Sequence, residues 1–397
     1  MTQSSSTVHE GRLPLALCLG IAAASGAAHI GINYTPYLVG GLIDRYGFGP
    51  ALMGIFSTAE TLAFAIAMFA FAPRAHHVRP RRLAIAASAM IAAVQAASAF
   101  TGVWPLLAAG RLLTGFGYGM LNTAVNVGAA RSVAPARAIS VGISLQVLLF
   151  VVMNITIPMI GAAGGVSAEF LALAAISAAL AMGMTLLPDT TAAERADAGD
   201  AVPPIAPGGW PVLAAMALFA FGTMAIWPFM ERAAHAIGLP ATQFGRYQAF
   251  AMLLSSFGNF ALTALLAGKP RRGLLEVALL TCGSTCALLT MVGSQWVFAV
   301  ALQFYNVSWY IVYPLLLGLA YAHDPHGRLA VRTTGTWLVA QSAGSLAAGF
   351  VAEATSGYSL VGGLGMGTCA IAVVIVARFQ ARRKSGVGHA PAHALAH

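Results

Sequence analysis

Polar side chains recur at helical spacing inside several long apolar segments of this chain. In the segment 13–36, Ser25, His29 and Asn33 follow one another every four residues, and Tyr37 continues the series. This spacing places the side chains on one face of an α-helix. Groups of this kind are costly inside an apolar helix unless they are used, so the face predicts contact with a polar solute, with protons or with water.

Glu60 and Arg111 are the ionisable residues placed deepest in their apolar segments, 51–72 and 105–130. A charge at the centre of a bilayer costs about 2.5–3.5 kcal/mol on insertion scales, and pairing is the usual remedy. One interpretation is therefore a structural ion pair. The other makes Glu60 a proton carrier whose protonation is controlled by burial and by Arg111, with His29 as a proton relay or a packing residue. The predicted proton-coupling residues are Glu60, Arg111 and His29.

The second half of the chain replaces buried charge with amides and aromatic rings. In the segment 295–320, Gln303, Asn306 and Tyr310 share a helical face, as do Trp337 and Gln341 in the segment 331–352. Aromatic stripes often only pack, but amides at the same phase favour a cavity lining. The predicted substrate-binding residues are Asn33, Tyr37, Tyr118, Asn122, Gln146, Trp227, Gln303, Asn306, Tyr310, Trp337 and Gln341.

The composition identifies the solvent in which these segments fold. Of the 397 residues, 58% are hydrophobic and 8% are charged, against roughly 25% charged residues in soluble domains. A helix needs about 20 apolar residues to cross a bilayer. Stretches of this kind number twelve, and the fold predicted is all-α, with 12 transmembrane helices. They lie at 13–36, 51–72, 82–100, 105–130, 137–160, 167–187, 210–230, 245–267, 273–292, 295–320, 331–352 and 359–379.

A repeat divides these stretches into two sets of six. Pro80, Arg81 and Arg82 recur as Pro270, Arg271 and Arg272, 190 residues further on. Gly47 and Gly54 likewise correspond to Gly238 and Gly245. Parallel repeats of this kind are common in secondary transporters. The predicted domains are a six-helix bundle over 1–188, a cytoplasmic linker over 189–209, a second six-helix bundle over 210–380 and a disordered cytoplasmic tail over 381–397.

Basic residues indicate the orientation, because cytoplasmic loops accumulate Lys and Arg. With the N-terminus inside, 17 of the 21 basic residues fall in cytoplasmic segments. Both termini are therefore expected in the cytoplasm, with the protein in the cell inner membrane. Asp44, Arg45, Glu231 and Arg232 fall near the opposite helix ends and are interpreted as interfacial. The net charge of +9 is spread over separate short segments, which argues against nucleic acid as a partner.

The fourth apolar stretch carries the clearest motif, with Arg111 followed by Gly115, Gly117 and Gly119. In this pattern the chain resembles transporters of the major facilitator superfamily over essentially its whole length. The loop after the second stretch keeps the basic pair Arg81 and Arg82, but His77 stands where the superfamily has an acid. Pro158 and Gly161 match only part of the antiporter motif. The resemblance implies two pseudo-symmetric six-helix bundles and alternating access to a site between them.

We therefore predict a monomeric secondary transporter for a small organic solute, coupled to protons. An aromatic or amphipathic compound, or an organic anion paired with Arg111, would suit the polar and aromatic residues. The close alternative is a multidrug efflux pump that exchanges drugs for protons. An integral membrane enzyme is disfavoured, because no set of nucleophile and base or of metal ligands is evident. A channel is disfavoured, because it would not need two six-helix halves joined by a long linker. We predict no metal and no cofactor, and the four cysteines lie within apolar stretches as packing residues.

Overall fold

A computed structural model describes residues 14–131, 135–190, 208–265, 273–324 and 328–387. These residues form helices joined by short turns and loops, with no strand among them. The helices of the first half are α1 (Leu15–Tyr46), α2 (Pro50–Phe71), η1 (Ala72–His77), α3 (Pro80–Ser98), α4 (Trp104–Ala129) and α5 (Pro135–Met184). Those of the second half are α6 (Trp210–Ile226), η3 (Trp227–Phe229), α7 (Met230–Ala236), α8 (Ala241–Leu265), α9 (Leu274–Met291), α10 (Gln295–His323), α11 (Arg328–Thr355) and α12 (Ser359–Val387).

Within the described residues, each of the twelve apolar stretches lies mostly in helix, and two places differ from the simple pattern. Stretches five and six are joined in α5, where Gly165 interrupts the helix with φ 67°. Stretch seven is divided into α6, η3 and α7. The division occurs at Pro228, which cannot donate the backbone hydrogen bond that a continuous helix needs. Seven helices of the described residues are long and apolar enough to cross a membrane by length and composition alone.

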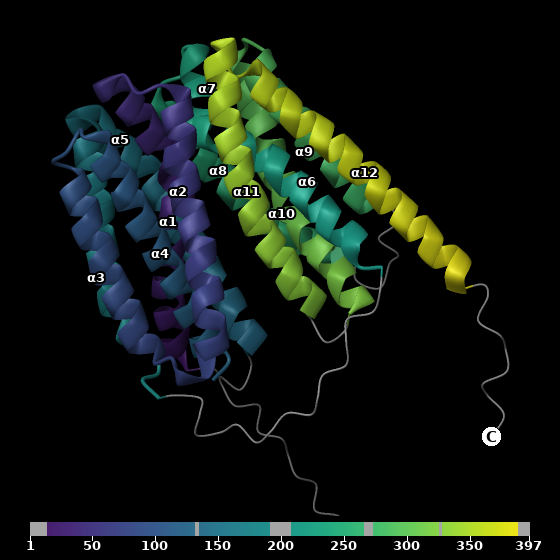
Figure 1. Cartoon of the computed structure of the whole chain (residues 1–397), viewed down its shortest axis with the longest axis horizontal. Coiled ribbons are helices and arrows are strands. Elements are labelled where there is room, and N and C mark those ends of the chain that lie inside the picture. Colours follow the sequence, from purple (N-terminus) through teal and green to yellow (C-terminus); the bar gives the residue numbers. More distant parts are fainter. Residues whose placement is uncertain (1–13, 132–134, 191–207, 266–272, 325–327, 388–397) are drawn as a thin grey trace, which may run out of the picture.

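The helices form two bundles that stand side by side (Figure 1). In the first bundle α1 packs on α5 and α2 packs on α4, and in the second α9 and α6 pack on α12. The bundles meet along two seams, α2 against α11 and α5 against α8. We call the end of the molecule at the α2–α3 connection, which carries Arg81 and Arg82, the basic end. The opposite end, at the α1–α2 turn, is the far end.

The sequence repeat appears as matched local geometry. Gly47 ends α1 with φ 66°, and its counterpart Gly238 follows α7 with φ 78°. Both positions use the left-handed conformation that glycine adopts without strain. Gly54 and Gly245 then lie at equivalent places on the two seams, with Gly54 against Gly349 of α11 and Gly245 against the backbone of Asn154 in α5. Close approach of the helices at both seams depends on these missing side chains.

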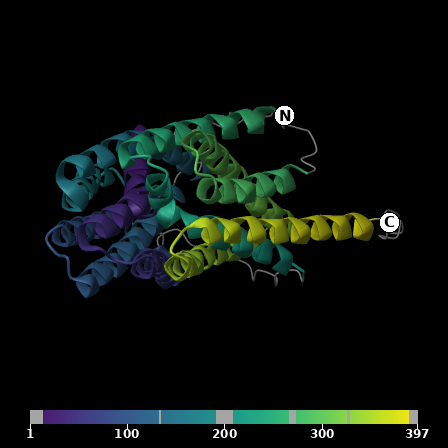
Figure 2. The same cartoon turned by 90° about the horizontal axis from the view of Figure 1, so that it is seen from above.

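The two bundles are joined at the far end. At that end the backbone N–H of Ala51 donates to Glu353 Oε2 over 2.8 Å. Nearer the middle of the molecule, the hydroxyls of Thr61 and Ser342 are 2.7 Å apart, and the Trp227 Nε1–H donates to the Ile32 carbonyl oxygen over 2.6 Å. The helices of the two bundles diverge from there toward the basic end, as Figure 1 shows, and Figure 2 shows the same two bundles side by side from above. The structure is therefore a state in which the far end is closed.

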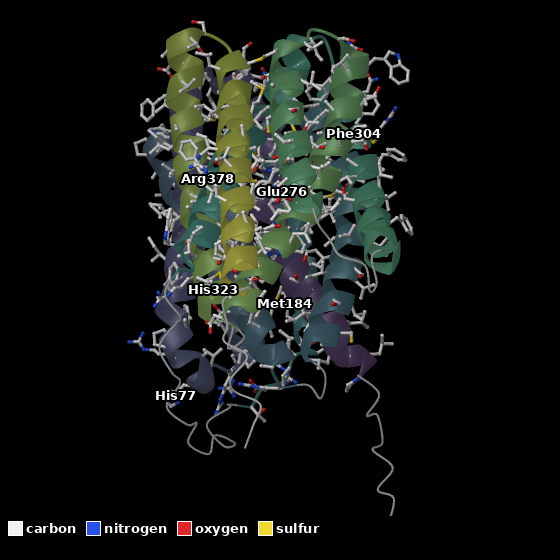
Figure 3. The ribbon with its side chains drawn as sticks, turned by 90° about the vertical axis from the view of Figure 1, so that its right-hand side faces the viewer. His77, Met184, Glu276, Phe304, His323 and Arg378 are labelled. Atoms are coloured by element: carbon white, nitrogen blue, oxygen red, sulfur yellow. The ribbon has the colours of Figure 1, made fainter. Side chains whose placement is uncertain are left out.

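The ends of the chain differ in part from expectation. Helix α12 continues to Val387, so residues 381–387, expected to be disordered, are helical. Most of the expected linker 189–209 and the last ten residues lie outside the described part of the chain. Figure 3 places His77 toward the basic end and Phe304 on the outer surface of the second bundle. Phe304 is 56% exposed there, as a side chain that faces lipid can be.

Candidate functional site

A cavity of about 510 Å³ lies between the two bundles, in the part of the molecule where their helices diverge. Its lining comes from α1, α2, α4 and α5 on one side and from α6, η3, α8, α10 and α11 on the other. It brings together most of the residues expected to contact substrate. Those that line it are Asn33, Asn122, Gln146, Trp227, Asn306, Tyr310 and Trp337, together with His29.

The wall from the first bundle is polar and preorganised. Ser25 Oγ donates to Gln146 Oε1, and His29 Nδ1 lies 2.9 Å from the Ser25 carbonyl oxygen. A carbonyl oxygen can only accept, so His29 uses Nδ1 as a donor and keeps Nε2 for another partner. The Asn33 side chain donates to the His29 carbonyl oxygen over 2.8 Å. These bonds fix the side chains before any solute arrives.

The wall from the second bundle is a group of stacked rings. The Trp309 and Tyr313 rings are parallel within 3°, with centroids 5.7 Å apart. Trp337 meets the Tyr313 ring edge-on at 5.5 Å, and Tyr310 meets the Trp309 ring in the same way at 5.5 Å. The indole Nε1–H groups of Trp309 and Trp337 are buried and have no hydrogen-bond partner. Unpaired buried donors beside a cavity are suited to an acceptor on a bound molecule.

Gln248 and Asn306 form an amide pair at the edge of this wall. Gln248 Nε2 donates to Asn306 Oδ1 over 3.0 Å, and Asn306 Nδ2 donates to Gln248 Oε1 over 3.2 Å. Sequence analysis missed Gln248 and Trp309 as lining residues. Trp309 could have been found, because it follows Asn306 by three residues and precedes Tyr313 by four, which places all three on one face.

The described residues that line the cavity include no Asp, Glu, Lys or Arg. His29 is the one lining side chain among them that can take up a proton to become a cation. A charged solute would therefore lose hydration in the cavity without gaining an opposite charge. The lining favours a neutral solute.

Glu60 and Arg111 lie apart from the cavity, inside the first bundle. Arg111 Nη1 is 2.8 Å from Glu60 Oε2, and the two side chains are 2% and 1% exposed. The guanidinium also lies over the Phe56 ring, 4.4 Å from its centroid. Gly31 of α1 and Gly115 of α4 pack directly against Glu60. The pair thus ties α2 to α4 in a closely packed region, as the structural interpretation expects, and the coupling role of Glu60 stays a prediction.

Four other residues expected to contact substrate do not line the cavity. Tyr37 donates to Asn154 Oδ1 over 2.9 Å, and Tyr118 accepts from Gln95 Nε2 over 3.1 Å. Gln303 Nε2 donates to the Tyr247 carbonyl oxygen over 3.2 Å, and Gln341 is buried at 1% exposure. Each shares a helical face with lining residues but lies at another height or turns toward a neighbouring helix. Periodicity gives the face of a helix and not the depth of the cavity along it.

The comparisons with known proteins agree with the fold. The family model of the Major Facilitator Superfamily matches residues 15–349. No curated protein sequence matches the chain. The crystal structure of the nucleoside transporter NupG has a TM-score of 0.69 at 12% identity and covers 94% of this chain and 100% of its own. That of the human organic anion transporter MFSD10 (TETRAN) has a TM-score of 0.61 at 16% identity and covers 90% of this chain and 98% of its own.

These structural similarities establish a shared fold, but sequence identities this low do not identify the solute. The family match, however, covers both bundles up to α11. It accounts for the paired bundles and for the cavity between them. The chain belongs to the Major Facilitator Superfamily, and it is a multi-pass membrane transporter and not an enzyme.

Proposed function

We propose that this transporter moves a small uncharged compound with a flat aromatic or heteroaromatic ring, by alternating access through the central cavity. The observation that carries the proposal is the stacked wall of Trp309, Tyr313 and Trp337 in a lining without charged side chains. Stacking on such rings contributes about 1–3 kcal/mol per bound ring. The organic anion considered from the sequence is disfavoured, because Arg111 is enclosed in the first bundle.

The polar groups of the cavity match the edges of such a ring. The free Nε1–H donors of Trp309 and Trp337 need acceptors, and ring nitrogens or carbonyl oxygens supply them. Asn122 and Asn126 add amides from α4. A cavity of about 510 Å³ lies within the usual range for small-molecule sites. Nucleosides have these properties, and NupG, whose fold this chain shares, is a nucleoside transporter.

Efflux of apolar drugs is the second candidate. It is favoured by the apolar part of the lining, which includes Ile32, Phe64, Val147, Met252 and Leu338. Such a surface would hold a hydrophobic compound without using the indole donors. Proton coupling is part of both proposals, and a monomer suffices for both, because one chain supplies both walls of the cavity.

A ligand panel distinguishes the candidates. Purified protein should bind uncharged ring compounds such as uridine, adenosine or caffeine at least tenfold more tightly than benzoate, since the cavity offers benzoate no positive charge. Quenching of tryptophan fluorescence, checked by calorimetry, measures the affinities. Liposomes that contain a pH dye then report whether uptake moves protons. Tighter binding of benzoate would refute the neutral-solute proposal, and binding of an uncharged hydrophobic dye such as Nile red alone would favour drug efflux.

We also propose that the basic end faces the cytoplasm of an inner-membrane protein, because Arg79, Arg81 and Arg82 cluster there. Fluorescent-protein fusions at Gly199, which lies outside the described residues, and after His397 should both be bright, since such reporters fold in the cytoplasm. A dark fusion at Gly199 beside a bright one after His397 would require an odd number of spans in the second half, contrary to six.

A further inference from the structure

A cluster of charged side chains closes the far end of the molecule, away from the cavity. Asp44 of α1 and Glu169 of α5 come from the first bundle, and Glu231 and Arg232 of α7 come from the second. We call these four residues the far-end cluster. Sequence analysis placed Glu231 and Arg232 at the membrane interface, but they are only 2% and 8% exposed. It gave Glu169 no role.

Arg232 binds two carboxylates at once. Its Nη1 and Nη2 donate to the two oxygens of Asp44 over 2.6 and 3.0 Å. Its Nε and Nη2 donate to the two oxygens of Glu231 over 2.7 and 3.0 Å. The bonds to Asp44 join the two bundles. Gly40, without a side chain, lets Glu231 and Arg232 pack directly against α1.

Glu169 is the fourth member of the cluster, and it makes no hydrogen bond to Arg232. Its side chain interacts electrostatically with Glu231, Arg232 and Asp44. The residue is 5% exposed, and its Oε2 atom has no hydrogen-bond partner. That oxygen lies 3.3 Å from the position that a Cβ of Gly41 would occupy, so it points toward α1. An ionised carboxylate would be left there with one oxygen unsatisfied, which is costly.

The charges of the far-end cluster do not balance. Three carboxylates and one guanidinium carry a net charge of −2 when all are ionised. Arg45 is the other cation nearby on α1, and its Nη1 donates to Ser167 Oγ over 2.8 Å in an exposed part of the surface. Tyr37 on α1 and Tyr358, between α11 and α12, also face the cluster. Neither phenol supplies positive charge, so one bound proton is the simplest way to lower the excess negative charge of the cluster.

Alternating access breaks this arrangement. When the far end opens, Asp44 and Arg232 must separate because they belong to different bundles. Water then reaches Glu169, and hydration stabilises its ionised form. The closed state and the open state therefore differ in their affinity for a proton at this position. A ligand bound more tightly by one state shifts the population toward it.

We propose that Glu169 is a proton-binding site of the far-end gate, occupied when the gate is closed and released when it opens. The proton exchanges with the solution at the far end. It controls the gate and does not pass through the cavity. Acidification on that side therefore favours closure. The inference requires alternating access but no particular solute, so it stands or falls separately from the ligand panel.

The experiment measures the gate directly, without substrate. Phe100 and Trp296 are each 81% exposed, on the α3–α4 connection of the first bundle and in the first turn of α10 in the second. The variants Phe100→Cys and Trp296→Cys, combined, take spin labels, while the four native cysteines are buried. Distance distributions in nanodiscs from pH 5 to 9 should show the ratio of closed to open gate falling as pH rises. For one proton the limit is tenfold per pH unit.

Two variants identify the group that titrates. Glu169→Gln imitates the protonated side chain, so the gate should stay mostly closed with little dependence on pH. Glu231→Gln removes one negative charge from the far-end cluster and should reduce the pH-dependent change while Glu169 is retained. Glu353→Gln is the matched control, because Glu353 also bridges the bundles at this end but is exposed. It should leave the pH profile as in the parent.

The outcomes decide the proposal. A parent protein whose distances do not change with pH would overturn it. So would a Glu169→Gln protein that keeps the full pH response, since another group would then bind the proton. If Glu169→Gln fails to fold, the Glu231→Gln profile alone decides, and an undiminished response there would count against Glu169.

Discussion

Trp337→Ala should weaken binding of the tightest uncharged ring compound by roughly 5- to 150-fold. The range corresponds to the loss of about 1–3 kcal/mol of stacking per ring. Trp337 touches both partners of the aromatic wall, with centroids 5.5 Å from Tyr313 and 6.2 Å from Trp309. Its removal therefore takes away a binding surface and loosens the two rings that remain. Calorimetric titration of the purified variant measures the change in Kd.

Two further variants separate stacking from hydrogen bonding at this position. Trp337→Phe keeps a ring but loses the Nε1–H donor. Its affinity for the ring compound should therefore lie between those of the parent and of Trp337→Ala. Trp296→Ala is the control, because Trp296 is 81% exposed in the first turn of α10 and does not line the cavity. Unchanged affinity in Trp337→Ala would mean that the rings only pack and that the solute binds elsewhere.

Arg111→Ala should destabilise the protein by about 3–5 kcal/mol, the usual cost of removing one partner from a buried ion pair. The variant leaves the Glu60 carboxylate inside the first bundle without its cation. Thermal unfolding in detergent, followed by tryptophan fluorescence, should show a lower Tm. Arg82→Ala is the matched control. Arg82 pairs with Asp189 at 3.4 Å but is 67% exposed, and exposed pairs contribute little.

Glu60→Gln tests the two roles considered for this acid. If Glu60 is structural, Glu60→Gln should fold less stably than the parent yet still accumulate solute in response to a pH gradient. The double variant Glu60→Gln with Arg111→Gln should recover part of the stability lost in Arg111→Ala, because no charge is left unpaired. A Glu60→Gln protein that melts like the parent but has lost gradient-driven accumulation would instead make Glu60 the proton carrier.

The spans and their pairing were predictable because they follow from one-dimensional patterns. Apolar length fixes a membrane helix, and the offset between Gly47 and Gly238 reproduces a turn that needs positive φ. Lining residues such as Asn33 and Asn306 were predictable for a similar reason, since helical periodicity identifies the face turned toward the other bundle. Family membership then agrees with the paired bundles.

Depth and partners were not predictable from the same patterns. Tyr118 shares a face with Asn122, yet it lies one turn nearer the far end, where it contacts Gln95 instead of the cavity. Gln248 becomes a lining residue through its pairing with Asn306, 58 residues away. Glu169 lies in the stretch 167–187 after the kink at Gly165, and its neighbours Asp44, Glu231 and Arg232 come from other helices. Each depends on distances between helices, which the sequence of one helix does not contain.

The charge-free lining of the cavity also has an electrical consequence. Moving one elementary charge across a membrane potential of 100 mV changes its free energy by about 2.3 kcal/mol. A neutral solute surrounded by neutral side chains moves no charge, so voltage can act only on coupled ions and on protein charges that change position. Arg232 and Asp44 lie at one end of the molecule, where little of the field is traversed when they separate. If the solute is neutral as proposed, exchange of one solute molecule for another without net movement of protons is therefore expected to be electrically silent.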